Sequence, residues 1–238
     1  MRAVQKGEVF LIGGGRDEEA LVDAHAGLAA ALGGGVLLCL VADDGEGIDE
    51  GRWRGMLGDA GVVACEVVRI AEDRLPAPSD FAGIGGLYVA GGLTPLYARL
   101  LAPLRGSLPS GMVYAGYSAG AAVAAEHALV GGWLLDGHAV CPDDAAEDLD
   151  EVTVAAGLGL VPFAVEVHAT QWGTLGRAIA AVRSGLVPEV WALDENTGLH
   201  LVTGREGEVR GAGQCHHIAR SGQGVLVEAW PAGVPVHL

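Results

Sequence analysis

Residues 112–125 read MVYAGYSAGAAVAA, and the order of residue types here is the clearest indication of a fold class in the chain. The apolar segment Met112–Gly116 predicts a buried strand, and the small residues of Ala119–His127 predict a helix. Ser118 lies between them in Gly-x-Ser-x-Gly, whose glycines allow a sharp turn and close packing of helix against strand. We therefore predict a strand–turn–helix unit that presents the Ser118 hydroxyl at the edge of a sheet.

The segments on either side repeat this alternation of short apolar runs with Ala/Leu-rich stretches. Continuous apolar strands that alternate with helices indicate an α/β fold, with a mostly parallel sheet and helices on both faces. The further strands predicted before residue 194 are Glu8–Ile12, Val36–Val41, Val62–Arg69, Leu87–Ala90, Ala164–Val167 and Val190–Leu193, and the further helices are Glu18–Leu32, Arg52–Ala60, Leu96–Leu104 and Leu175–Arg183.

From Gly198 onward, short strands separated by glycine-rich turns predict a C-terminal antiparallel β meander. The acidic segment Cys141–Glu151 has no hydrophobic periodicity, so we expect a mobile surface loop there. The chain contains no linker-like segment and no internal repeat, and we expect residues 1–238 to form a single domain. The predicted strands of the meander are His200–Val202, Glu208–Arg210, His216–Ala219 and Gly224–Glu228.

The composition of the 238 residues excludes several classes of protein. Half of the residues are hydrophobic and 18% are charged, which excludes an intrinsically disordered chain. The 14 basic and 30 acidic residues give a net charge of −16, which argues against nucleic acid or an anionic membrane as a partner. No apolar run resembles a membrane span or a signal peptide, so we expect a cytoplasmic protein. The four cysteines are scattered, so we expect no metal site.

A nucleophilic serine needs a general base, and the base needs an acid to orient it. His168 directly follows a predicted strand, at the end where α/β sheets present functional side chains. Glu195 follows the next predicted strand. Glu166 lies two residues before His168, and on a regular strand the two side chains would share a face. Both glutamates are therefore candidates for the acid.

Two backbone amides are candidates for stabilising an oxyanion. Ala119 follows the serine at the start of the predicted helix, and its amide points toward the turn. Gly91 and Gly92 end another predicted strand, and glycines at such a position let backbone amides face a ligand. The chain lacks both the Walker loop and Gly-x-Gly-x-x-Gly, so a nucleotide cofactor is poorly supported.

Five motifs in a shared order resemble the peptidase E / cyanophycinase family of serine peptidases, over residues 9 to about 228. The resemblance implies a class I glutamine amidotransferase-like fold that needs no metal or organic cofactor. It also implies Ser118 as nucleophile, His168 as base and Glu195, favoured over Glu166, as the acid, with oxyanion amides from Gly92 and Ala119. The motifs are Leu11-Ile12-Gly13-Gly14-Gly15, Gly91-Gly92-Leu93-Thr94, Gly116-Tyr117-Ser118-Ala119-Gly120-Ala121, Gly157-Leu158-Gly159-Leu160 before His168, and Leu193-Asp194-Glu195-Asn196-Thr197.

The same resemblance implies a small peptide as substrate. Peptidase E members cleave dipeptides with an N-terminal aspartate, and an acidic substrate would need a cation such as Arg16 or Arg177. Trp172 and Thr174 stand where cyanophycinase-like sequences are basic, so we expect a less cationic, more apolar pocket. The candidate substrate-binding residues are Thr94, Glu166, Gln171, Trp172 and Arg177.

Three alternatives to a dipeptidase remain open. A cyanophycinase-like hydrolase would use the same three residues on a different substrate. An α/β-hydrolase-type esterase would place its acid before its histidine, for example Asp194 before His216 or His217. A non-catalytic member of the fold would bind a small ligand instead. The sequence favours neither a monomer nor a homodimer.

Overall fold

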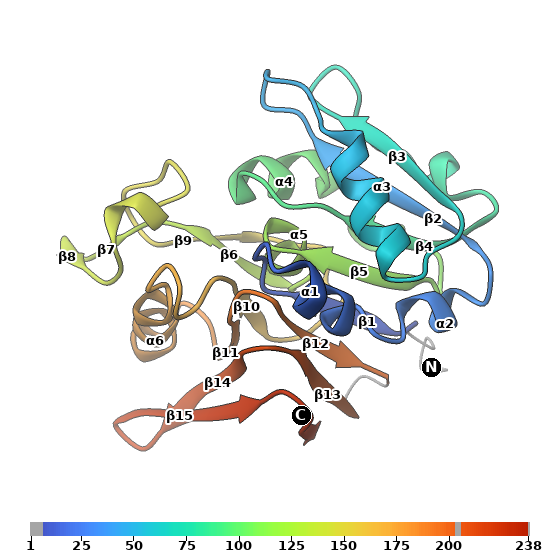
Figure 1. Ribbon diagram of the computed structural model, residues 1–238. Coiled ribbons are helices and arrows are strands. Elements are labelled where there is room, and N and C mark those ends of the chain that lie inside the picture. The colour runs from blue at the N-terminus through green and yellow to red at the C-terminus, as the bar shows by residue number, and fades with distance from the viewer. Residues whose placement is uncertain (1–6, 203–205, 238) are drawn as a thin grey trace, which may run out of the picture.

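A computed structural model describes residues 7–202 and 206–237, and its centre is a twisted eight-stranded sheet (Figure 1). The strand order is β16-β13-β12-β1-β5-β4-β2-β3. The five strands from β1 to β3 are mutually parallel, which confirms the predicted mostly parallel sheet. Their bounds are β1 Val9–Ile12, β5 Val113–Tyr117, β4 Ile84–Val89, β2 Val36–Ala42 and β3 Cys65–Ile70.

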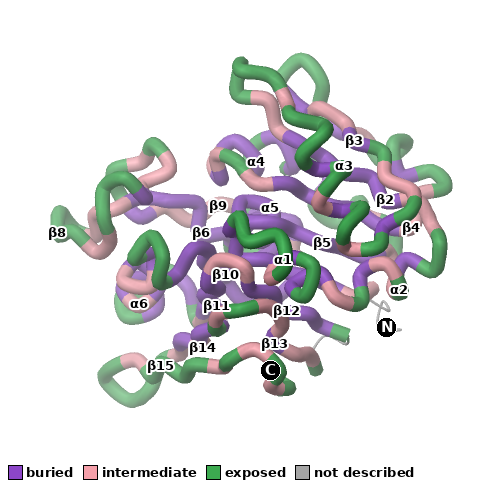
Figure 2. Tube along the Cα trace, in the orientation of Figure 1, coloured by how far each residue is buried: buried purple, intermediate pink, exposed green. Residues whose placement is uncertain are grey.

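Helices cover both faces of this sheet. On one face α1 (Glu18–Ala24) contacts α3 (Glu50–Asp59), and on the other α4 (Thr94–Leu100) contacts α5 (Ala119–Val123). Strands covered on both sides must be apolar along their whole length. Figure 2 shows this pattern, with a buried central sheet and exposed segments around it, and every residue of β1 and β5 is buried.

Two predicted helices are each divided into two shorter helices. The predicted helix Glu18–Leu32 is divided into α1 and α2 (Leu28–Leu32), because Gly27 between them takes a left-handed φ of 94°. The predicted helix Leu96–Leu104 is α4 followed by a 3₁₀ helix, Ala102–Leu104. A second 3₁₀ helix, Pro78–Phe81, precedes β4.

The C-terminal strands are antiparallel, as predicted, and they are divided between two sheets. Two predicted strands of the meander and one strand that was not predicted extend the central sheet: β12 (Thr197–Leu201) pairs antiparallel with β1, β13 (Glu206–Gly211) pairs with β12, and the unpredicted β16 (Pro235–His237) pairs with β13. The other two strands of the meander, β14 and β15, join β10 and β11, which were predicted in the α/β part of the chain, in a second sheet of order β10-β11-β14-β15 that packs against α6. Their bounds are β10 Ala164–Glu166, β11 Glu189–Leu193, β14 Gln214–Ser221, β15 Gly224–Pro231 and α6 Leu175–Ser184.

The segment between α5 and β10 contains short strands that were not predicted. The helix expected over Ala119–His127 ends at Val123, and His127 instead begins β6 (His127–Gly131), which pairs antiparallel with β9 (Thr153–Ala156). The two residues of β7 (Leu134–Leu135) and the two of β8 (His138–Ala139) follow as a small hairpin, then a 3₁₀ helix, Asp143–Ala145. Over residues 7–202 and 206–237, no helix is long and apolar enough to cross a membrane.

Candidate active site

Ser118 lies on a strained turn between β5 and α5, at φ 52° and ψ −114°. The turn is possible because two glycines bring the backbones together: a Cβ on Gly116 would clash with Gly120, and a Cβ on Gly120 would clash with the carbonyl oxygen of Val89. A non-glycine residue at such φ and ψ costs about 1–3 kcal/mol, so the surrounding packing must hold it there. The predicted strand–turn–helix unit is therefore present.

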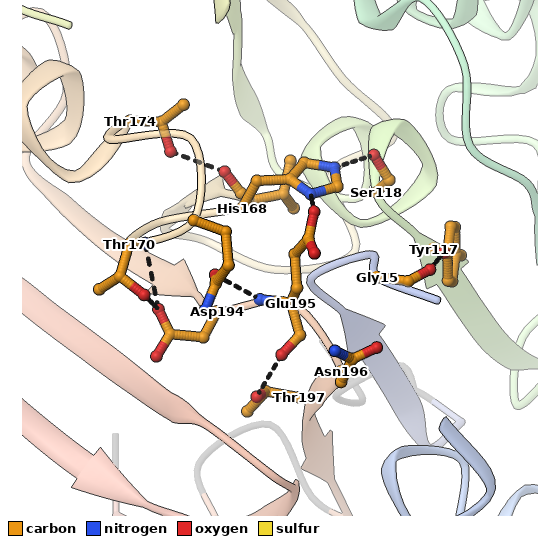
Figure 3. Close-up of polar contacts among 12 residues, drawn as sticks. Gly15, Tyr117, Ser118, His168, Thr170, Thr174, Asp194, Glu195, Asn196 and Thr197 are labelled. Carbon is orange, nitrogen blue, oxygen red and sulfur yellow. Dashed lines mark hydrogen bonds and ion pairs between the residues drawn. The ribbon is translucent and has the colours of Figure 1, made fainter. Parts of the chain in front are cut away.

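An unbroken hydrogen-bonded chain links Ser118, His168 and Glu195 (Figure 3). The Ser118 Oγ lies 2.8 Å from His168 Nε2, and His168 Nδ1 lies 2.8 Å from Glu195 Oε1. A carboxylate can only accept hydrogen bonds, so the contact with Glu195 requires the hydrogen on Nδ1, which leaves Nε2 as the acceptor for the serine hydroxyl. Burial lowers the pKa of His168, and the hydrogen bond and charge of Glu195 oppose that shift. The imidazole is thus held neutral and correctly oriented to accept a proton.

The first glycine loop holds the base and the acid at the same sheet edge. The amide of His168 donates to Gly13 O at 3.1 Å, and the amide of Asn196 donates to Gly14 O at 2.7 Å. Gly14 has φ 95°, and a Cβ there would clash with the His168 ring. Because β12 runs antiparallel to β1, its first residues lie beside the carboxyl end of β1, where this loop begins.

Each member of the hydrogen-bonded chain either has a strained backbone itself or lies next to a residue that has one. Besides Ser118, His168 has φ 54°, and Asn196, next to Glu195, has φ 57°. Non-glycine residues at positive φ are uncommon and concentrate at functional sites. Each of these three turns follows a strand end, so the backbone turns sharply where the side chains converge.

Gln171 and Trp172, two candidates for binding substrate, contact the hydrogen-bonded chain itself. The Gln171 Oε1 accepts a hydrogen bond from the Glu195 amide at 2.8 Å. The Trp172 ring stacks on the His168 ring, with centroids 3.9 Å apart and planes inclined by 8°. Trp172 is 43% exposed and lines the cleft, so it can contact both the imidazole and a substrate.

Glu166 and Arg177 are not among the residues that line the cleft, and their pairing with each other does not support the predictions that Glu166 orients His168 or that either residue binds substrate. Their side chains form a buried ion pair with Arg177 Nε–Glu166 Oε2 at 2.7 Å and Nη2–Oε1 at 2.9 Å. Glu166 is 1% exposed and Arg177 is 3% exposed. The expected shared face with His168 fails because β10 ends at Glu166 and the positive φ of His168 turns the backbone.

The acidic segment Cys141–Glu151 forms one wall of the cleft, which corrects the prediction of a mobile surface loop. Arg177 Nη1 donates to the carbonyl oxygens of Ala145 at 2.7 Å and Gly132 at 3.1 Å. The Glu147 carboxylate accepts from the Thr94 amide at 2.8 Å, and burial raises its pKa while that hydrogen bond opposes the shift. Thr94 is itself buried at the start of α4, behind this contact, so its predicted role in substrate binding is not supported.

The cleft has a volume of about 1100 Å³ and opens onto Ser118, His168 and Glu195. Gly92 lines it, and Ala119 follows Ser118 as the first residue of α5. In residues 7–202 and 206–237, neither amide has a hydrogen-bond acceptor. Both amides are therefore available to an oxyanion. The wall carries aromatic side chains, two arginines and the acidic segment: Trp53, Tyr117, Trp133, Trp172, Arg16, Arg52 and residues 143–150.

The residue order expected for an α/β-hydrolase places an acid before a histidine, and such a pair is present away from the serine. His216 Nε2 lies 3.5 Å from Asp194 Oδ1. Burial raises the pKa of Asp194, but the nearby His216 ring and hydrogen bonds from Thr170 and the Gln214 amide outweigh it and leave that pKa below its usual value. The Ser118 hydroxyl pairs with His168 instead, so the arrangement differs from the esterase order.

No family model matches the sequence, and no curated protein matches it. Among solved structures, the chain is similar to one described as a "Putative Peptidase E Protein from Listeria monocytogenes EGD-e", with a TM-score of 0.54 and 16% identity. The alignment covers 93% of this chain and 98% of that one. The chain has a peptidase E-like fold. Because the likeness covers nearly the whole chain, the peptidase E-like fold includes the central sheet and the antiparallel C-terminal strands.

Proposed function

We propose that the protein is a serine peptidase that hydrolyses short peptides through Ser118, His168 and Glu195. The hydrogen-bonded chain from the serine hydroxyl to the glutamate, which opens into a cleft, carries this proposal. The peptidase E-like fold supports the same class of chemistry.

The geometry accommodates a two-step acyl transfer. His168 Nε2 takes the hydroxyl proton as Ser118 Oγ attacks the scissile carbonyl carbon, and the amides of Gly92 and Ala119 hold the resulting oxyanion. Glu195 stabilises the imidazolium, which then protonates the leaving amine as the C–N bond breaks. His168 then takes a proton from a water molecule as the water oxygen attacks the acyl carbon, and the imidazolium gives that proton to Ser118 Oγ as the ester bond breaks and the acid product leaves. Every step uses residues of this chain and water.

The decisive experiment compares the wild-type protein with Ser118→Ala on a dipeptide library. The alanine variant should lose about 10⁴–10⁶-fold in kcat and keep its circular dichroism spectrum. Ser107→Ala, at an exposed serine outside the cleft, is the matched control and should keep full activity. Wild-type turnover by the Ser118→Ala protein would refute the proposal.

The same assay separates the alternatives. Hydrolysis of a p-nitrophenyl ester with every dipeptide left intact would favour an esterase. Cleavage of the cyanophycin polymer would favour a cyanophycinase-like hydrolase. A folded protein without any of these activities would favour a ligand-binding role. The cytoplasmic location, the absence of a cofactor and the monomeric or dimeric state stay predictions.

A further inference from the structure

Asp194 connects the turn that follows His168 with the turn that carries Glu195. Its Oδ1 accepts a hydrogen bond from the Thr170 hydroxyl at 2.7 Å and another from the Thr170 amide at 3.2 Å (Figure 3). Thr170 lies two residues beyond His168, and Asp194 directly precedes Glu195. One carboxylate therefore ties together the two segments whose side chains form the hydrogen bond between base and acid.

Asp194 is itself anchored by the second sheet. Its Oδ2 accepts a hydrogen bond from the Gln214 amide at 3.1 Å, and its own amide donates to the Gln214 carbonyl oxygen at 3.0 Å. His216 Nε2 lies 3.5 Å from Oδ1. A Cβ on Gly213 would lie 2.7 Å from the Asp194 Cβ, so glycine allows this close approach of the two segments. The carboxylate is thus fixed by β14 on one side and holds Thr170 on the other.

The Asp194 carboxylate provides a charged link between the two turns. Burial raises its pKa, but its polar contacts outweigh that shift and leave the pKa below its usual value, so the group is ionised at neutral pH. Hydrogen bonds to an ionised group are roughly twice as strong as those between neutral groups. Two neutral bonds accompany it: the Ala169 amide donates to Leu193 O at 3.0 Å, and the Glu195 amide donates to Gln171 Oε1 at 2.8 Å.

The turn after His168 needs such a link because its backbone is strained. His168 has φ 54°, and a non-glycine residue at such an angle costs about 1–3 kcal/mol, which the surroundings must offset. The bond from the His168 amide to Gly13 O, at 3.1 Å, fixes the chain before the strained residue. Beyond it, Thr170 is exposed, and in the described chain its amide and hydroxyl donate only to Asp194.

Neither Asp194 nor Thr170 is placed to touch a substrate. Within residues 7–202 and 206–237, the residues that line the cleft include neither of them. Loss of the link should therefore disturb the alignment of the His168 ring and leave the contacts with substrate in place. The expected signature is a lower kcat at a nearly constant KM.

We propose that Asp194 is a positioning residue: it holds Thr170, and so keeps the His168 imidazole aligned for proton transfer. The proposal rests on the proposed peptidase function. Asp194 acts through the backbone of the turn, without contact with the reacting atoms.

Thr170→Val tests the link at an exposed position, where the fold should tolerate the change. Valine keeps the shape of threonine but removes the hydroxyl donor. On a dipeptide that the wild type cleaves, kcat should fall about tenfold at constant KM, which is less than the roughly hundredfold loss that a 1 Å displacement of a catalytic group can cause. Thr170→Ser keeps the donor and should recover most of the loss.

Thr153→Val is the matched control. The Thr153 hydroxyl donates to Glu151 O at 2.7 Å, and neither residue is among those that line the cleft, so kcat should stay at the wild-type value. A wild-type kcat in Thr170→Val, an equal loss in Thr153→Val, or a higher KM at constant kcat would overturn the proposal.

Asp194→Asn tests the carboxylate itself. Its NH₂ group must face a donor, either on Thr170 or at the Gln214 amide, so kcat should fall further than in Thr170→Val. Circular dichroism and thermal unfolding show whether the variant folds. Because Asp194→Asn also loosens the contact with β14, Thr170→Val remains the deciding variant.

The titration of His168 separates this proposal from the peptidase proposal, because it needs no substrate. Nitrogen-15 NMR of histidine-labelled protein follows each ring, and the His168 signals are assigned by their absence from His168→Asn protein. Burial lowers the pKa of His168, and the hydrogen bond and charge of Glu195 oppose that shift. A ring that is displaced from Glu195 should therefore titrate at lower pH in Thr170→Val than in the wild type.

The two proposals then have different outcomes. A titration at lower pH in Thr170→Val, with no peptide cleaved by the wild type, would support the positioning role and contradict the peptidase proposal. The same His168 titration in Thr170→Val and in the wild type would overturn the positioning role, whatever the activity.

Discussion

His168 is the residue on which the site depends, and four neighbours fix it. Ser118 and Glu195 hold its two ring nitrogens, Trp172 covers one ring face, and Gly13 accepts its backbone amide. Burial lowers its pKa, and Glu195 opposes that shift. The protonation of one imidazole should therefore control the pH dependence of activity.

Glu195→Gln should change both the rate and the pH profile. The base must be neutral, so the acid limb of wild-type kcat/KM should lie below pH 6.5, the ordinary pKa of histidine. Removal of the glutamate charge lowers that pKa further, so the limb should move to lower pH while kcat falls roughly 10³–10⁴-fold. Steady-state kinetics from about pH 4 to pH 9 measure both effects.

Glu166→Gln is the comparison variant, because Glu166 faces Arg177 and not the imidazole. In folded Glu166→Gln protein, the acid limb of kcat/KM should lie close to the wild-type pH. Its kcat should fall much less than that of Glu195→Gln. A larger loss from Glu166→Gln in fully folded protein would return the role of the acid to Glu166.

Trp172 should affect the chemical step as well as substrate binding. Its stack on His168 resembles an aromatic pair worth about 0.5–1.5 kcal/mol, so Trp172→Leu should lower kcat by up to roughly tenfold. Trp172→Phe retains an aromatic face and should recover most of that loss. Trp133→Leu is the control, because Trp133 lines the same cleft without stacking on His168 and should mainly change KM. An equal kcat for Trp172→Leu and Trp172→Phe would show that the aromatic stack on His168 does not contribute to the chemical step.

At the scale of elements, one buried ion pair joins three parts of the site. Glu166 ends β10, Arg177 lies on α6, and the arginine also donates to Ala145 in the acidic wall. β10 leads directly into His168, so this pair connects the strand that carries the base with the wall of the cleft. Its removal should therefore affect stability and the wall together.

Arg177→Met should destabilise the protein strongly. It leaves the Glu166 carboxylate buried without a partner, which typically costs about 3–5 kcal/mol. Urea unfolding measures the loss, and limited proteolysis should show faster cleavage in residues 141–151, whose carbonyl contact is also lost. Arg183→Met, on the same helix, is the control, because Arg183 makes no side-chain ion pair in the described residues. Unchanged unfolding of Arg177→Met would show that the pair contributes little.

At the scale of the molecule, the parallel half of the fold could be predicted because its strands, apart from β3 with Glu66 and Arg69, contain no charged residue. The division of the C-terminal strands could not, because it depends on pairing between distant segments, such as Val9–Ile12 with residues 198–201. Ser118, His168 and Glu195 could be found because strand ends converge at one sheet edge. Arg52 and Trp133 carry no local signal, and only the fold brings them into the cleft.

The whole molecule should also respond to salt. With 30 acidic and 14 basic residues, repulsion among carboxylates, including those of the acidic wall, opposes the compact state. The Debye length falls from about 30 Å at 0.01 M to about 3 Å at 1 M, so added salt screens this repulsion. Exposed pairs such as Arg54–Glu50 and Arg99–Glu72 are screened as well, but each is worth only about 0–1 kcal/mol.

The thermal midpoint at pH 7 should therefore rise with ionic strength. A gain of about 1 kcal/mol between 0.01 M and 0.5 M sodium chloride would raise Tm by about 2–4 °C in a chain of this length. Scanning calorimetry measures the shift, and potassium chloride should give the same value. Chloride is used because sulfate also strengthens apolar burial through exclusion from the surface, which would raise Tm for a different reason. A Tm that stays constant or falls would mean that exposed ion pairs outweigh the repulsion among the excess carboxylates.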